Sequence, residues 1–168
     1  MADGQLPHVS VAVIGSFRQH YDRVLGAVHT FRDAGWTVTS PLGTEIIELG
    51  IEFVRFTSDR PVWDDPTVQS IALHRILRAD LVYVVAPDGY VGRTTCYEIG
   101  RIVQANRPLF FSEHPKDLPL AVPAERVHEA PAVVALVREA SPQTLFDGDE
   151  SAYAELERRL LHGDFVPD

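Results

Sequence analysis

A single glutamate, Glu98, stands among apolar residues in the segment TTCYEIGR, directly after two threonines. A carboxylate in the first turn of a helix is favoured in its ionised form by the helix dipole. Beside a cleft, an ionised carboxylate can attack the anomeric carbon of a sugar or stabilise an oxocarbenium-like centre. Ile99, Ile102 and Val103 follow at helical spacing, so we expect Glu98 at the edge of the core. The segment therefore predicts chemistry at a glycosidic bond.

The same segment also fits a purely structural role. Thr95 and Glu98 have the spacing of a capping box, in which a threonine at the N-cap and a glutamate three residues later satisfy each other's backbone N–H groups. Such patterns are common at helix starts. The sequence leaves both roles of Glu98 open.

Two further residues are candidate catalytic helpers. Asp88 can orient sugar hydroxyls or protonate the leaving base, and His74 can serve as an acid because the ordinary pKa of histidine lies near neutrality. Asp88 equally suits the turn PDG, which aspartate favours, and His74 equally suits a helix surface. Asp59, in FTSDRP, is a further carboxylate at the mouth of the expected site.

Cationic and hydroxyl side chains follow two of the apolar runs. Gly15 ends the first apolar run, VSVAVIG, and Ser16 and Arg18 follow it. Arg93 and Thr94 follow the run LVYVVA. A helix N-terminus with a hydroxyl and a guanidinium can bind a 5′-phosphate. The alternative is that Ser16 is only an N-cap and Arg18 only a surface residue. The two arginines favour a nucleotide over a nucleoside as the ligand.

The second of these turns is rich in glycine. Gly89 and Gly92 allow a close approach of the backbone to a ligand, although they also suit an ordinary turn. Tyr90 and Phe17 are candidates for stacking on a base. Either aromatic ring can instead pack against the sheet.

Strand-like and helix-like segments alternate along the chain. The strands are expected at 9–15, 36–41, 81–87 and 108–113, and the helices at 16–35, 64–80 (starting at Asp65), 94–106 and about 149–163. Residues 52–59 fit a strand or a lid, and residues 130–140 fit a strand or a helix. This alternation predicts an α/β fold, a single domain with a flavodoxin-like or Rossmann-like parallel sheet of about five strands sandwiched between helices. Ligands of such sheets bind beyond the carboxyl ends of the strands, so both glycine turns should open onto one crevice.

The overall composition narrows the function classes. The 168 residues carry a formal net charge of -9, which argues against binding to a nucleic acid polymer. The single Cys96 allows no internal disulfide, and the chain has neither a signal-peptide pattern nor an apolar run long enough for a membrane. Histidines and cysteines lack metal-ligand spacing, and a phosphate-binding loop of the G-x-x-x-x-G-K-[ST] type is missing. We expect a cytoplasmic protein that acts on a small molecule without a metal or cofactor.

Three segments resemble the nucleoside 2-deoxyribosyltransferase-like superfamily, which includes 2′-deoxynucleoside 5′-phosphate N-hydrolases and nucleotide N-glycosidases. They are VAVIGSFR, ADLVYVV and DGYVGRTTCYEIGR, and the resemblance covers roughly residues 9–113. It implies that Glu98 is the nucleophile, which displaces the base and forms a glycosyl-enzyme intermediate. It also implies pairing of subunits, as a homodimer or a higher homo-oligomer.

The sequence departs from this family at the helper carboxylates. The family's position on the preceding helix is Ala72 here, with His74 the nearest polar candidate, and Asp88 is the only carboxylate of the loop. Three functions follow as alternatives. The first is hydrolysis of the base–sugar bond, the second is base exchange by a deoxyribosyltransferase, and the third is a non-catalytic nucleotide sensor. The fold alone would also suit a flavin-binding protein.

Overall fold

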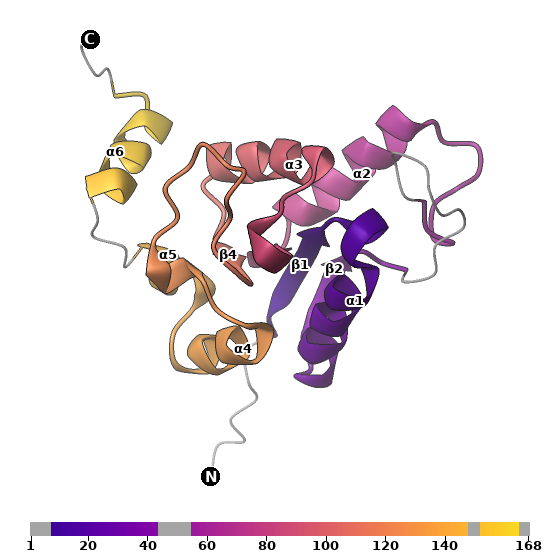
Figure 1. Ribbon diagram of the computed structural model, residues 1–168, viewed down its shortest axis with the longest axis horizontal. Coiled ribbons are helices and arrows are strands. Elements are labelled where there is room, and N and C mark those ends of the chain that lie inside the picture. Colours follow the sequence, from indigo (N-terminus) through magenta and orange to yellow (C-terminus); the bar gives the residue numbers. More distant parts are fainter. Residues whose placement is uncertain (1–7, 44–54, 148–151, 165–168) are drawn as a thin grey trace.

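The structure is a computed structural model that describes residues 8–43, 55–147 and 152–164. Within these ranges the chain forms one α/β domain, a parallel sheet flanked by helices (Figure 1). The strand order is β2-β1-β3-β4, and each neighbouring pair is parallel. The strands are β1 (Ser10–Gly15), β2 (Thr37–Ser40), β3 (Leu81–Val85) and β4 (Leu109–Phe111).

Helices cover both faces of this sheet. They are α1 (Phe17–Asp33), α2 (Asp65–Leu77), α3 (Arg93–Gln104), α4 (Ala130–Glu139), α5 (Pro142–Asp147) and α6 (Ala152–Leu161), with short 3₁₀ helices η1 (Pro87–Gly89) and η2 (Ala124–Arg126). The helices α1 and α4 lie on one side, and α2 and α3 lie on the other (Figure 1). Along β1, Val11 and Val13 pack towards α1, whereas Ala12 and Ile14 pack towards α2 and α3. The strands are nearly continuously apolar because both faces are buried.

The parallel α/β fold is confirmed, but the described residues form four strands and not the expected five. Residues 130–139 of the ambiguous segment are helical because their apolar residues repeat at helical spacing and are buried: Ala130, Val133, Val134 and Val137. Beyond β4 the sheet is continued by one bridge, between Phe111 and Val127. The preceding segment holds Pro115, Pro119 and Pro123, which have no N–H to donate to a strand pair.

The start of α2 differs from the expectation. The N-cap of α2 is Asp64 and not Asp65, because the Asp64 carboxylate accepts a hydrogen bond from Thr67 N–H at 2.9 Å. For the expected strand or lid at 52–59, residues 52–54 lie outside the described part of the chain. Residues 56–59 form a turn.

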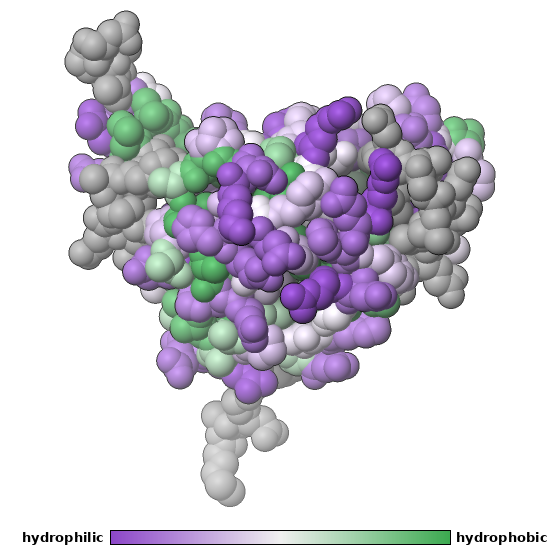
Figure 2. Space-filling view, in the orientation of Figure 1, coloured by the Kyte–Doolittle hydropathy of each residue, from purple (hydrophilic) through white to green (hydrophobic). Residues whose placement is uncertain are grey.

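The carboxyl-terminal helix agrees with the expectation over 152–161, and residues 149–151 lie outside the described part. The side chains of Leu156 and Leu160 on α6 are exposed, and the hydrophobic colour in Figure 2 extends over this helix. None of the helices in the described ranges is long and apolar enough to cross a lipid bilayer.

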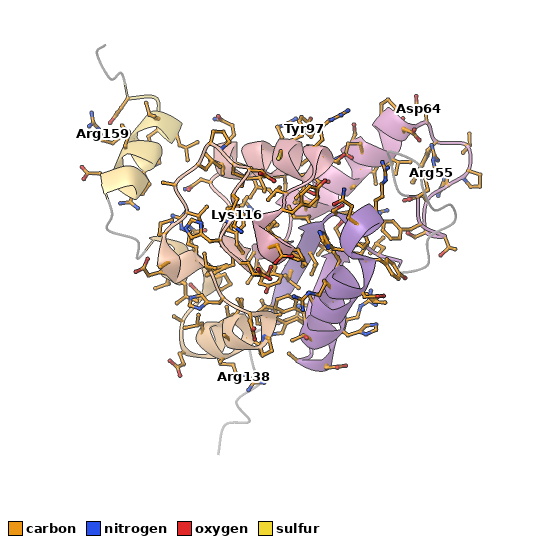
Figure 3. All side chains as sticks on the ribbon, in the orientation of Figure 1. Arg55, Asp64, Tyr97, Lys116, Arg138 and Arg159 are labelled. Atoms are coloured by element: carbon orange, nitrogen blue, oxygen red, sulfur yellow. The ribbon has the colours of Figure 1, made fainter. Side chains whose placement is uncertain are left out.

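Gly89 is held in a conformation that other residues rarely adopt. Its φ is +78°, and an added Cβ atom would lie 2.7 Å from the carbonyl oxygen of His114 and 2.7 Å from Cγ of Lys116. Lys116 is labelled in Figure 3. Its N–H also donates to the Gly89 carbonyl oxygen at 2.9 Å. The glycine is therefore required by the backbone of this turn.

We expect Gly89→Ala to lower the free energy of unfolding by about 2 kcal/mol or more, through backbone strain and the clash with His114. Gly100→Ala is the matched control, because Gly100 lies inside α3 and an added Cβ would meet nothing within 4 Å. This control should gain up to about 1 kcal/mol from helix propensity. Urea denaturation measures both changes, and an unchanged stability of Gly89→Ala would contradict the assignment.

Candidate active site

The two turns that the sequence singles out lie side by side at the carboxyl end of the sheet. Ser16 follows β1 and is the N-cap of α1, where its Oγ accepts a hydrogen bond from Gln19 N–H at 3.3 Å. Gly92 follows η1 and is the N-cap of α3. A Cβ atom added at Gly92 would lie 3.7 Å from the Ser16 Cβ. The starts of α1 and α3 therefore open onto one region, between the neighbouring strands β1 and β3.

This region is a cavity of about 300 Å³. Its walls come from the turn after β1, the end of β2, the 56–59 turn, one side of α2 and the first turns of α3. Every predicted substrate-binding residue except Gly89 lines it, namely Gly15, Ser16, Phe17, Arg18, Tyr90, Gly92, Arg93 and Thr94. The other lining residues are Val13, Ile14, Gln19, Ser40, Pro41, Leu42, Phe56, Ser58, Asp59, Val68, Gln69, Ala72, Arg75, Ile76, Thr95 and Glu98.

Glu98 lines the cavity, but the predicted capping box is wrong. The helix α3 begins at Arg93, with Gly92 as its N-cap, so Glu98 is its sixth residue. Thr95 is buried inside the first turn, and the N–H of Cys96 already donates to the Gly92 carbonyl oxygen at 2.9 Å. The helix starts earlier than expected because the chain turns directly at Gly92. Glu98 is thereby at the sixth helical position, about one turn further along the helix than the third position that the capping box requires.

The expectation that Glu98 is held ionised is also wrong. Its side chain is only 8% exposed, and burial raises its pKa to about 7. The effect of the helix dipole falls off within the first turn, so desolvation dominates at this depth. The side-chain amide of Gln69 on α2 donates to Glu98 Oε1 at 3.1 Å, which opposes the rise of the pKa. At neutral pH both forms of Glu98 are present, the nucleophilic carboxylate and the proton-donating acid.

The two predicted helper residues do not line the cavity. Asp88 is exposed in η1, and its N–H donates to Glu113 Oε2 at 2.9 Å. His74 is exposed on α2, two residues beyond Ala72, so it points away from the side of the helix that faces the cavity. The alternatives from the sequence fit both residues: Asp88 belongs to the PDG turn, and His74 lies on the surface of α2. Gly89, which is also outside the cavity, serves the fold.

The structure adds Gln69 and Arg75, which the sequence did not single out. Gln69, Ala72 and Arg75 are spaced three residues apart on α2 and line the cavity together. This spacing was the available signal, since Ala72 already marked the side of the helix that faces the site. Asp59, named only as a carboxylate at the mouth, is 8% exposed and lines the cavity.

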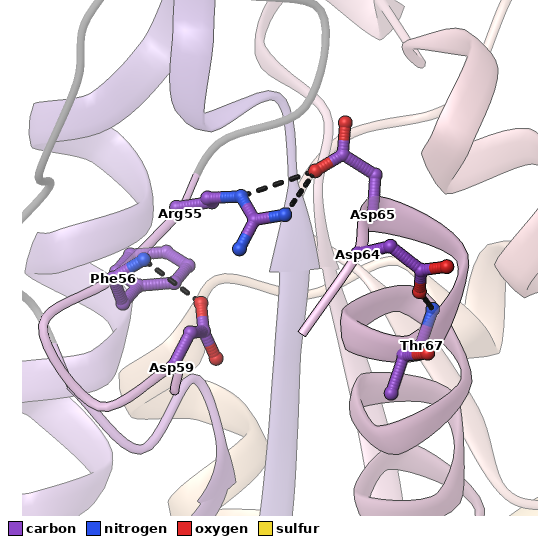
Figure 4. A network of polar contacts seen from close by, with 6 residues as sticks. All are labelled: Arg55, Phe56, Asp59, Asp64, Asp65 and Thr67. Carbon is purple, nitrogen blue, oxygen red and sulfur yellow. Dashed lines mark hydrogen bonds and ion pairs between the residues drawn. The ribbon is translucent and has the colours of Figure 1, made fainter. Parts of the chain in front are cut away.

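Asp59 has a structural task in its own turn. Its Oδ2 accepts a hydrogen bond from Phe56 N–H at 2.9 Å (Figure 4). Its own N–H donates to the Phe56 carbonyl oxygen at 2.9 Å. The adjoining segment is tied to α2 by an ion pair between Arg55 and Asp65 (Figure 4). These contacts hold the Phe56 ring edge-on to Phe17, with their centroids 5.0 Å apart. The cavity thus has an aromatic pair on its wall.

The charges around the cavity are unevenly distributed. Arg18 and Arg93 are exposed at the starts of α1 and α3, where the helix dipoles also favour an anion. Arg75 is half-buried against the end of β2. The carboxylates of the wall are Glu98 and Asp59. The arrangement suits a ligand with an anionic group at the helix starts and a neutral body beside Glu98.

In comparisons with family models, curated proteins and solved structures, nothing matches this chain. Residues 8–43, 55–147 and 152–164 contain no group of three or more histidine, cysteine, aspartate or glutamate side chains arranged to hold a metal ion.

Proposed function

We propose that this protein cleaves the base–sugar bond of a nucleoside or nucleoside 5′-monophosphate, with Glu98 as the nucleophile. The observation that carries the proposal is a buried carboxyl group with a pKa of about 7 on the wall of a cavity of about 300 Å³. A titratable group perturbed by desolvation inside a cavity is a candidate for catalysis. The volume of the cavity lies at the lower end of the range that is typical of small-molecule sites.

The chemistry requires the ionised form of Glu98. One carboxylate oxygen attacks C1′ of the sugar as the bond to the base breaks, and a glycosyl ester of Glu98 results. Attack of water on C1′ then releases the sugar and restores the carboxylate. The bond from Gln69 steadies the carboxyl group for this attack. The resemblance to the nucleoside 2-deoxyribosyltransferase-like superfamily supports the same role for Glu98.

The residues at the helix starts support a nucleotide as the substrate. Ser16 at the N-cap of α1, Arg18 in its first turn, and Arg93 and Thr94 in the first turn of α3 line one end of the cavity. Main-chain N–H groups, hydroxyls and guanidinium groups bind phosphate together. Phosphate at this end leaves the sugar and the base for the part of the cavity between Glu98 and α2.

Purified protein incubated with a panel of nucleosides and 5′-nucleotides tests the proposal, with free base detected by liquid chromatography. We expect base release, faster from nucleotides. A second base added to the mixture distinguishes transfer from hydrolysis, since transfer yields a new nucleoside. Binding of nucleotides without release of base would instead support the non-catalytic sensor.

Arg18→Gln should raise KM for the 5′-nucleotide by about 10- to 100-fold, the value of a hydrogen bond to a charged group, and leave KM for the nucleoside unchanged. The matched control is Arg23→Gln, because Arg23 lies exposed on the same helix and does not line the cavity. Steady-state kinetics on both substrates measures the difference. An equal effect of Arg18→Gln on nucleoside and nucleotide would exclude a contact with the phosphate.

A further inference from the structure

Five residues of α2 line the cavity: Val68, Gln69, Ala72, Arg75 and Ile76. Val68 and Ile76 are apolar and buried. Gln69 is engaged by Glu98, and the methyl group of Ala72 can neither donate a proton nor bind an anion. Arg75 is therefore the residue of this helix that can act on a ligand directly. Its backbone lies next to β2, the strand at the edge of the sheet.

Arg75 is fixed to β2 through its backbone. Its carbonyl oxygen accepts a hydrogen bond from Thr39 Oγ1 at 3.1 Å, which ties the last turns of α2 to β2. Within the described part of the chain, its guanidinium group has no hydrogen-bond or ion-pair partner. The side chain is half-buried, so water only partly screens its charge.

A base that leaves a sugar must be protonated or must be stabilised as an anion. Of the two carboxyl groups on the wall, Glu98 is needed for the attack, and Asp59 holds the N–H of Phe56. The predicted proton donors Asp88 and His74 lie outside the cavity. An arginine does not give up a proton in proteins, but its N–H groups bind anionic oxygen strongly. Arg75, the remaining charged side chain of α2 on the wall, therefore suits a base that departs as an anion.

We propose that Arg75 binds the 2-oxo group of a pyrimidine base and stabilises the departing base as an anion, so that the substrates are nucleotides of 2,4-dioxopyrimidines. This inference rests on the proposed function. A dioxopyrimidine spreads the negative charge over N1 and its two oxo groups. Adenine has no oxo group for Arg75 to bind.

The reaction balances without any further reagent. The carboxylate of Glu98 forms a bond to C1′ while the C1′–N1 bond breaks. The electron pair of the C1′–N1 bond stays with the base. The anionic base takes a proton from water. The hydroxide that remains attacks C1′ of the glycosyl ester, and this yields the sugar phosphate and the free carboxylate of Glu98.

The experiment compares two leaving groups in the wild-type protein and in Arg75→Gln. One substrate is uridine or deoxyuridine 5′-monophosphate, and the other is a 4-nitrophenyl riboside 5′-phosphate, whose phenolate needs no help to depart. We expect Arg75→Gln to lower kcat on the uracil nucleotide by about 10²- to 10³-fold, the typical loss for one donor to a developing anion. The loss on the nitrophenyl substrate should be less than about threefold. Arg78→Gln, at the exposed C-cap of the same helix, is the control and should change neither rate.

Three results would overturn the assignment of Arg75. Equal losses on both substrates would show a general effect on folding or on phosphate binding. Adenine released by the wild-type protein as fast as uracil would exclude selection for an oxo base. If the wild type releases neither a base nor nitrophenolate, the proposed function itself is wrong and the assignment falls with it. Release of nitrophenolate separates these cases, since it depends on Glu98 and not on Arg75.

Discussion

Replacing Glu98 by glutamine is expected to reduce base release by about 10⁴-fold or more while the protein stays folded. The amide cannot attack C1′, so no glycosyl ester forms. Its carbonyl oxygen can still accept the hydrogen bond from Gln69, which now reaches Glu98 Oε1 at 3.1 Å. Chromatography of the released base under single-turnover conditions measures the loss. Circular dichroism and thermal melting establish that the variant is folded.

Glu155→Gln provides the matched control, because Glu155 is an exposed glutamate on α6 and does not line the cavity. It should leave base release unchanged. Base release by Glu98→Gln at the wild-type rate would refute Glu98 as the nucleophile. If the wild-type protein binds nucleotides but releases no base, the function is binding and the carboxyl group has another role.

The same substitution is expected to stabilise the fold at alkaline pH. Glu98 has a pKa of about 7 in the folded protein and an ordinary value of 4.5. Between these two values the folded state binds more protons than the unfolded state, so stability falls as the pH rises. The loss reaches roughly 3 kcal/mol above pH 7, because each pKa unit corresponds to about 1.4 kcal/mol. Glutamine carries no charge at any pH and avoids this loss.

Urea denaturation at pH 5 and at pH 9 tests this expectation without reference to any substrate. Relative to the wild type, Glu98→Gln should gain about 2.5 kcal/mol more at pH 9 than at pH 5, since a small part of the loss has already occurred at pH 5. Glu155→Gln, exposed on α6, should show no such difference between the two pH values. A stability difference between Glu98→Gln and the wild type that does not change with pH would mean that Glu98 is not desolvated.

The fold was largely predictable from the sequence because patterns that extend over whole segments specify its strands and helices. Continuous apolar runs such as residues 81–85 are typical of strands buried on both faces, and their alternation with helices fixes the parallel topology. The fifth strand could not be predicted correctly, since a short apolar segment such as 130–137 fits a strand or a helix equally well. Its burial against α1 decides for the helix, and that contact is tertiary.

The candidate site was predictable where its residues directly follow a predicted strand. The turns that hold Ser16 and Gly92 were expected to share a crevice, and the structure brings them together. The partners of Glu98 were less accessible, because Gln69 lies 29 positions away and meets it only when α2 packs beside α3. The pKa of Glu98 could not be predicted either. It depends on depth in the fold, and the position of the first helical residue, Arg93, sets that depth.

The bond between Gln69 and Glu98 joins two helices at the centre of the site. A carboxamide carries both a donor and an acceptor, so half a turn of its terminal group lets it receive a hydrogen from protonated Glu98 as readily as it gives one to the carboxylate. The bridge between α2 and α3 can therefore outlast the gain or loss of a proton. The pH of the solution would then change the reactivity of Glu98 and leave the shape of the pocket the same.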